Sequence, residues 1–149
     1  GDLELVQFLI HHRVDLHQLG PNNASNLMSA VMSQQMDIVT YLLEKTDCNI
    51  NHQDNNGRTA LQLIVESDSV ECTKLLLNNG ALNIPNVSNI TPLMLAAIHG
   101  KQLLIDAFDE YYSQKELIEA FDEYYSQKEL IEAYELLGTT LAEHRILKH

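Results

Sequence analysis

The stretch Thr91-Pro-Leu-Met-Leu-Ala-Ala-Ile-His-Gly-Lys101 decides the fold of this chain. Thr91 stands where the hydroxyl group of an N-cap residue belongs. Pro92, at the next position, has a ring that fixes the backbone angle of a first helical turn. The stretch therefore predicts a short helix that begins after Thr91.

Two further copies of this stretch lie earlier in the chain. Ser25-Asn-Leu-Met-Ser-Ala-Val-Met and Thr59-Ala-Leu-Gln-Leu-Ile-Val-Glu align with it, and the three starts are 34 and 32 residues apart. A second helical pattern follows the first two starts, in residues 37–44 and 71–78, and a similar one lies at 4–11. Between these patterns lie strings rich in Asn, Asp and Gly, which favour tight turns. The chain therefore consists of repeats, each with two helices and a turn.

The third copy, TPLMLAAIHGK at residues 91–101, resembles the ankyrin signature. The resemblance implies an all-α ankyrin-repeat solenoid, in which each repeat has a turn finger, a short inner helix and a longer outer helix. Apolar residues on more than one side of a helix pair, such as Leu61, Leu63 and Ile64, agree with stacked repeats. We assign residues 1–106 to a partial first repeat, two full repeats and a third repeat. A helical hairpin array of another kind would share the period.

The remaining residues, 107–149, contain an identical tandem string. Residues 107–119 read AFDEYYSQKELIE, and residues 120–132 repeat them without a change. The identity indicates a recent duplication, an engineered insertion or an error in the gene model. A helix turns through about 1,300° over such a string, which rotates the downstream face by about 220°. We therefore expect a helical C-terminal extension in which the added copy loops out or displaces the chain end. One long amphipathic helix is the alternative.

The chain is acidic, with 21 Asp and Glu against 9 Lys and Arg and a formal net charge of −12. Nucleic acids and anionic membranes attract clustered Lys and Arg, so neither is expected as the main partner. A basic protein or peptide fits better. Cys48 and Cys72 form no CxxC pair, and no apolar run reaches the length of a membrane span. We therefore expect a reduced chain in the cytoplasm or the nucleus.

The chain begins at Gly1 within a repeat, so we expect an excised piece whose residues 1–17 form a truncated outer helix and loop. Leu3, Val6 and Leu9 would then lack the inner helix that covers them and would be partly exposed. The sequence carries no nucleophile, phosphate-binding or zinc motif, and its seven histidines are scattered. We therefore expect no catalysis, no metal site and no cofactor.

A second resemblance comes from Ile131-Glu-Ala-Tyr-Glu-Leu-Leu-Gly-Thr-Thr, which follows the ankyrin repeats. This order is similar to the feminization-protein (Fem) family, with Tyr134 in place of a usual Leu and Thr139 in place of a usual Ala. The resemblance implies a substrate receptor of cullin-RING ubiquitin ligases that captures protein C-termini, often ending in Arg. Recruitment of the ligase would need regions absent from this chain. A plain ankyrin interaction scaffold or adaptor, without a ubiquitin role, is the alternative.

The ankyrin resemblance also indicates where a partner binds, because such proteins bind ligands at the finger tips and the exposed side of the inner helices. It implies the following peptide-binding residues: Asn55, Asn56, Arg58, Glu66, Ser67, Asp68, Ile98 and His99. Glu66 or Asp68 would pair with a terminal Arg. The same architecture adds positions in the next repeat, Val87, Ser88 and Ile90, and in the preceding one, Pro21, Asn22, Ala24, Met32 and Ser33.

Overall fold

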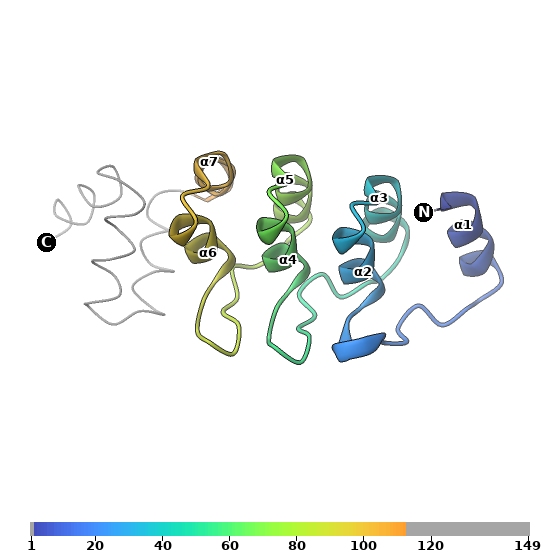
Figure 1. Cartoon of the computed structure of the whole chain (residues 1–149). Coiled ribbons are helices and arrows are strands. Elements are labelled where there is room, and N and C mark those ends of the chain that lie inside the picture. The colour runs from blue at the N-terminus through green and yellow to red at the C-terminus, as the bar shows by residue number, and fades with distance from the viewer. Residues whose placement is uncertain (1, 113–149) are drawn as a thin grey trace, which may run out of the picture.

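The computed structural model describes residues 2–112, which form a single row of helix pairs (Figure 1). Three pairs stand side by side, each with a short inner and a longer outer helix, and a finger extends below each pair. No strand occurs among these residues, so the predicted all-α solenoid is confirmed. The elements in chain order are α1 (Leu3–His11), η1 (Pro21–Asn23), α2 (Asn26–Met32), α3 (Met36–Lys45), α4 (Ala60–Glu66), α5 (Val70–Asn78), α6 (Pro92–Ile98) and α7 (Gln102–Tyr111).

The inner helices begin as the sequence predicts. The hydroxyl oxygens of Ser25, Thr59 and Thr91 accept hydrogen bonds from backbone N–H groups three residues later, at 3.2, 3.4 and 3.2 Å. Each cap satisfies a donor that the first helical turn leaves unpaired. Each inner helix ends two residues before a left-handed residue, and the outer helix begins two residues after it. These left-handed residues are Gln34, Asp68 and Gly100, with φ of 54°, 60° and 63°.

The core is continuous from one helix pair to the next. Leu27, Leu61 and Leu93 occupy the same position of successive inner helices and are at most 1% exposed. In the central helix α4, residues Ala60 to Val65 are all buried, because α2 covers one side and α6 the other. Each pair therefore removes part of its apolar area from water by packing against its neighbours.

The fingers repeat one hydrogen-bond pattern and are joined to one another. The N–H groups of Asn55 and Val87 donate to the carbonyl oxygens of Asn22 and Asn56 in the preceding finger, both at 3.0 Å. Pro21 occupies the equivalent position of the first finger and has no N–H to donate. The series of finger-to-finger bonds therefore begins at the first finger of the described chain.

The N-terminal helix α1 stands beside α3 as an outer helix, with no inner helix against it among the described residues (Figure 1). Leu3 and Val6 are half-buried and Leu9 is 38% exposed, which confirms the expected partial exposure. Leu5 and Phe8 are more exposed, at 52% and 57%. A cleft of about 650 Å³ lies between α1, the following loop and the first helix pair.

The last described helix, α7, runs through the predicted boundary between residues 106 and 107. Ala107 and Phe108 are 1% and 0% exposed, because they complete the apolar face of this outer helix. The first residues of the duplicated string therefore belong to the third helix pair and not to a separate extension. Residues 113–149, with the rest of the duplication and the Fem-like string, lie outside the described residues.

Candidate recognition face

The predicted site residues lie at the finger tips, the finger bases and the C-terminal ends of the inner helices, which we together call the recognition face. Asn55 and Asn56 form the tip of the second finger and are exposed. Arg58 lies at its base, half-buried. The other predicted residues are exposed at the ends of two inner helices: Glu66, Ser67 and Asp68 at α4, and Ile98 and His99 at α6.

Arg58 is held by a buried carboxylate that sequence reasoning missed. Asp54, 6% exposed, accepts hydrogen bonds from the backbone N–H groups of Asn56 and Arg58, both at 2.9 Å. Its second oxygen, Oδ2, lies 3.0 Å from Nε and 2.9 Å from Nη2 of Arg58. Asn86 makes the same backbone bonds in the third finger, so an Asp or Asn five residues before each inner-helix Thr was the available signal. Asp54 thus fixes both the finger and the guanidinium.

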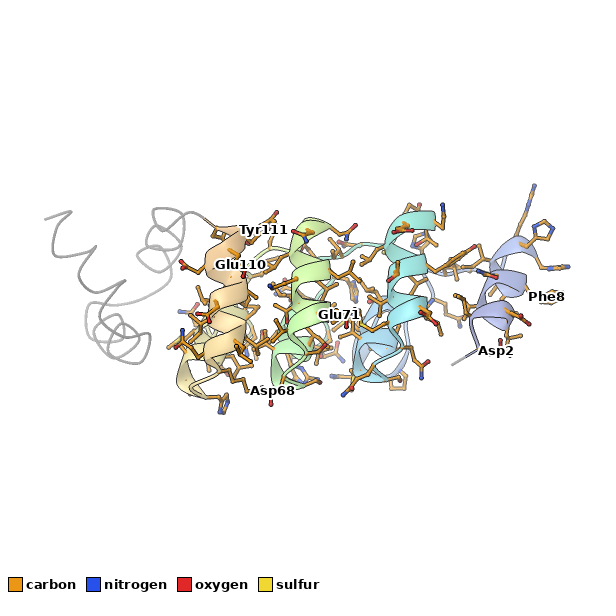
Figure 2. All side chains as sticks on the ribbon, turned by 90° about the horizontal axis from the view of Figure 1, so that it is seen from above. Asp2, Phe8, Asp68, Glu71, Glu110 and Tyr111 are labelled. Carbon is orange, nitrogen blue, oxygen red and sulfur yellow. The ribbon has the colours of Figure 1, made fainter. Side chains whose placement is uncertain are left out.

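Asp68 is held by Lys101, a second residue that sequence reasoning missed. The Lys101 ammonium lies 2.9 Å from Asp68 Oδ1 and donates to the carbonyl oxygens of Val65 at 2.8 Å and Glu66 at 3.3 Å. A cation at the C-terminal end of a helix is favourable, because the last carbonyl groups there lack helical partners. Asp68 lies at the edge of the stack opposite Tyr111 (Figure 2). Its carboxylate therefore already has a cationic partner within the chain.

Glu66 is the less engaged of the two candidate carboxylates. Its Oε2 atom lies 3.8 Å from Nη1 of Arg58, beyond hydrogen-bond distance, and its side chain is 43% exposed. The Arg58 charge is meanwhile balanced by Asp54 at shorter distance. The structure thus brings together Arg58, Glu66, Asp68 and Lys101, and leaves Glu66 as the carboxylate best able to accept a partner's donor. It does not bring Ile98 or His99 into this group of ion pairs.

The recognition face carries no sign of metal or thiol chemistry in the part of the chain that is described. No group of three or more His, Cys, Asp or Glu side chains could hold a metal ion there. Cys72 is buried, and this burial, with a smaller contribution from Glu71, raises the pKa of its thiol from 9.0 to about 11. The thiol is therefore protonated at neutral pH and is a poor nucleophile.

Among residues 2–112, no helix is both long and apolar enough to span a membrane.

Three known proteins from different animals are similar to this chain. Alpha-latrotoxin-Lg1a of Latrodectus geometricus is 34% identical over 99 residues, which is 64% of this chain and 7% of the toxin. The transient receptor potential cation channel subfamily A member 1 homolog of Caenorhabditis elegans is 33% identical over 102 residues, 68% of this chain and 8% of the channel. Protein fem-1 homolog A-like of Mus musculus is 30% identical over 95 residues, 64% of this chain and 14% of that protein.

These matches cover only a small part of each relative, so they report on the repeats and not on the activity of the whole proteins. A family model described as "Ankyrin repeats (3 copies)" matches residues 1–86 and 27–115. This match agrees with the capped inner helices, the left-handed turns and the linked fingers. The chain therefore belongs to the ankyrin-repeat family and is a protein–protein interaction module.

Proposed function

We propose that this chain is the substrate-recognition part of a Fem-like receptor and that its recognition face captures a basic protein C-terminus. The observation that carries the proposal is the half-exposed carboxylate of Glu66, which lies 3.8 Å from the Arg58 guanidinium, while the Lys101 ammonium donates to the Glu66 backbone carbonyl oxygen. A C-terminal Arg presents a guanidinium and an α-carboxylate. Glu66 would accept hydrogen bonds from the guanidinium, and one of the two cations would donate hydrogen bonds to the α-carboxylate.

Two further observations support this proposal. The similarity to protein fem-1 homolog A-like agrees with the Fem-like string that begins at Ile131. The net charge of −12 favours rapid encounter with a basic partner, although affinity depends on a few well-placed contacts. In this proposal the chain acts in the cytoplasm and is not catalytic. A cullin-RING ligase would be recruited by regions absent from this chain.

The test is a titration of peptides that end in Arg against the whole chain. We expect Glu66→Gln to weaken binding about tenfold, and amidation of the peptide C-terminus to weaken it by a similar factor. Glu71→Gln is the matched control, because Glu71 is an exposed carboxylate on the outer helix α5 (Figure 2) and should leave binding unchanged. If neither amidation nor Glu66→Gln changes the affinity, capture of a C-terminus is excluded.

A plain interaction scaffold is the second candidate. It is favoured by the similarity of the same repeats to a toxin and a channel as well as to a Fem protein. A scaffold would bind an internal segment as well as a chain end. Equal affinity for free and amidated peptides, with both lost in Glu66→Gln, would support this candidate over the receptor.

A further inference from the structure

At three sets of equivalent positions, the recognition face alternates between apolar and polar side chains from one repeat to the next. At the inner-helix ends the successive residues are Met32, Glu66 and Ile98, which we call the helix-end row. Met32 and Ile98 are 58% and 41% exposed. These residues occupy equivalent positions, each being the last residue of its inner helix. The row therefore runs from apolar to acidic to apolar across the stack.

Two other rows show the same order. The finger bases carry Ala24, Arg58 and Ile90, and the finger tips carry Pro21, Asn55 and Val87. Val87 is 74% exposed, the highest exposure of any large apolar residue described. In all three rows the first and third repeats offer apolar side chains, and the second offers polar or charged ones. A partner that lies across the stack thus meets a polar centre with apolar contacts on both sides.

The charge at this centre is set by the ion pairs. Arg58 is the cation of the second repeat, but its guanidinium is bound to Asp54 at 2.9–3.0 Å and its side chain is only 27% exposed. The Glu66 carboxylate has no contact shorter than 3.8 Å to a cationic atom in the described chain. The polar centre is therefore acidic toward a partner and complements a Lys or Arg side chain.

The spacing follows from helix packing. Packed helices lie about 8–10 Å apart, and a segment in the extended polyproline II conformation advances about 3.1 Å per residue, with every third side chain on the same side. Three residues of an extended segment therefore span about one repeat. An apolar residue that contacts Met32 or Ile98 should stand three positions from the basic residue that contacts Glu66.

Resting on the proposed function, we infer that the partner is an extended polypeptide with a basic residue and an apolar residue three positions away. An internal segment would carry an apolar residue on each side, and a segment ending in Arg would carry one upstream. The apolar residues would cover Met32 and Ile98, and the basic residue would lie over Glu66.

The experiment selects binders from a displayed library of random 12-residue peptides with the whole chain as bait. Three baits are compared: the wild type, Glu66→Lys, and Glu71→Lys as the control on the outer helix. We expect the wild type and Glu71→Lys to enrich apolar-x-x-basic-x-x-apolar sequences, and Glu66→Lys to enrich acidic residues at the centre. Met32→Ser and Ile98→Ser should each weaken selected peptides at least threefold, and circular dichroism shows whether each variant is folded.

Two contrary results have different meanings. Peptides that lose binding in the Glu66 variant but show no apolar residue at the third position would overturn the spacing and leave the proposed function standing. Peptides that bind all three baits alike would overturn the inference, because binding would then not depend on the charge of the residue at position 66. The proposed function is tested separately by peptides ending in Arg.

Discussion

At the scale of single residues, one position shows how the repeats differ in chemistry while keeping one backbone. Gly20, Asp54 and Asn86 are equivalent, and the N–H of each donates to a carbonyl oxygen four residues later, at 2.8, 2.9 and 3.0 Å. The Asp54 and Asn86 side chains also accept two backbone N–H bonds each. Only Asp54 carries a charge, and only its finger has an Arg at the base. The second repeat is thus polar because one buried carboxylate holds one guanidinium.

Cys72 gives a prediction about pH at the same scale. Because the folded thiol has a pKa of about 11 against an ordinary value of 9.0, the unfolded chain loses its proton first as the pH rises. The free energy of unfolding should therefore fall between pH 9 and 11, by at most about 1.4 kcal/mol per pH unit from this group. Below pH 9 both states keep the proton and the contribution is constant.

Urea denaturation of wild type and Cys72→Ala from pH 7.5 to 10.5 measures this slope. The variant loses a buried group at every pH, but the difference in stability between the two proteins should shrink as the pH rises. Tyrosine and lysine titrations are common to both proteins and cancel in that difference. A difference that stays constant across the range would contradict the raised pKa of Cys72.

Some structural roles could be predicted from the sequence and others could not, depending on how far apart in the sequence the contacting residues lie. Ser25, Thr59 and Thr91 bond three residues ahead, so their role as caps followed from local pattern. Lys101 contacts Val65, 36 residues away, and such a contact depends on how the repeats stack. The starts of the inner helices were therefore predictable, whereas the pairing that leaves Glu66 least engaged was not.

At the scale of elements, the fingers depend on close packing at one glycine. Gly57 has φ +72°, and a Cβ atom there would lie 2.9 Å from the Val87 backbone N and 3.1 Å from the Asn86 Cα. Gly100 has a similar φ of +63°, but a Cβ atom there would have no neighbour within 4 Å. Both positions disfavour alanine, but only the first also forces the third finger to move.

We therefore predict unequal effects of alanine at these two positions. Gly100→Ala should lower the free energy of unfolding by about 1 kcal/mol, and Gly57→Ala by about 2–3 kcal/mol. Hydrogen exchange should also show faster exchange of the Val87 amide in Gly57→Ala, because its bond to Asn56 would lengthen. Equal losses of stability would mean that the fingers adjust freely and do not hold neighbouring repeats together.

At the scale of the whole molecule, the chain is a linear stack in which each repeat depends on its neighbours. The interior helix α4 is the most completely buried, and α1 at one end has no buried residue. The period of the sequence predicted this arrangement. The last outer helix was harder to delimit, because α7 extends into a string whose identical copy suggested a separate unit. The burial of Phe108 shows that the third helix pair extends past residue 106, although the duplicated string begins at residue 107.

The last prediction concerns the duplication. Deletion of residues 107–119 should destabilise the protein less than deletion of residues 107–112 alone. Removing residues 107–119 brings Ala120-Phe-Asp-Glu-Tyr-Tyr125 directly after Asp106, which restores the sequence of residues 107–112. Phe108, which is fully buried, is thereby replaced by an identical residue. We expect this variant to keep the helix content per repeat and the unfolding midpoint of the full chain.

Removing only residues 107–112 is the matched control. Ser113 and Gln114 then follow Asp106 and take the positions of Ala107 and Phe108. A polar side chain would replace the buried ring of Phe108, and loss of a buried aromatic side chain costs about 3–5 kcal/mol. Thermal unfolding followed by circular dichroism should show a large decrease in stability for this six-residue deletion and almost none for the 13-residue deletion. If the longer deletion unfolds the repeats as well, both copies contribute to the core, and the stack extends beyond α7 through contacts that require the second copy.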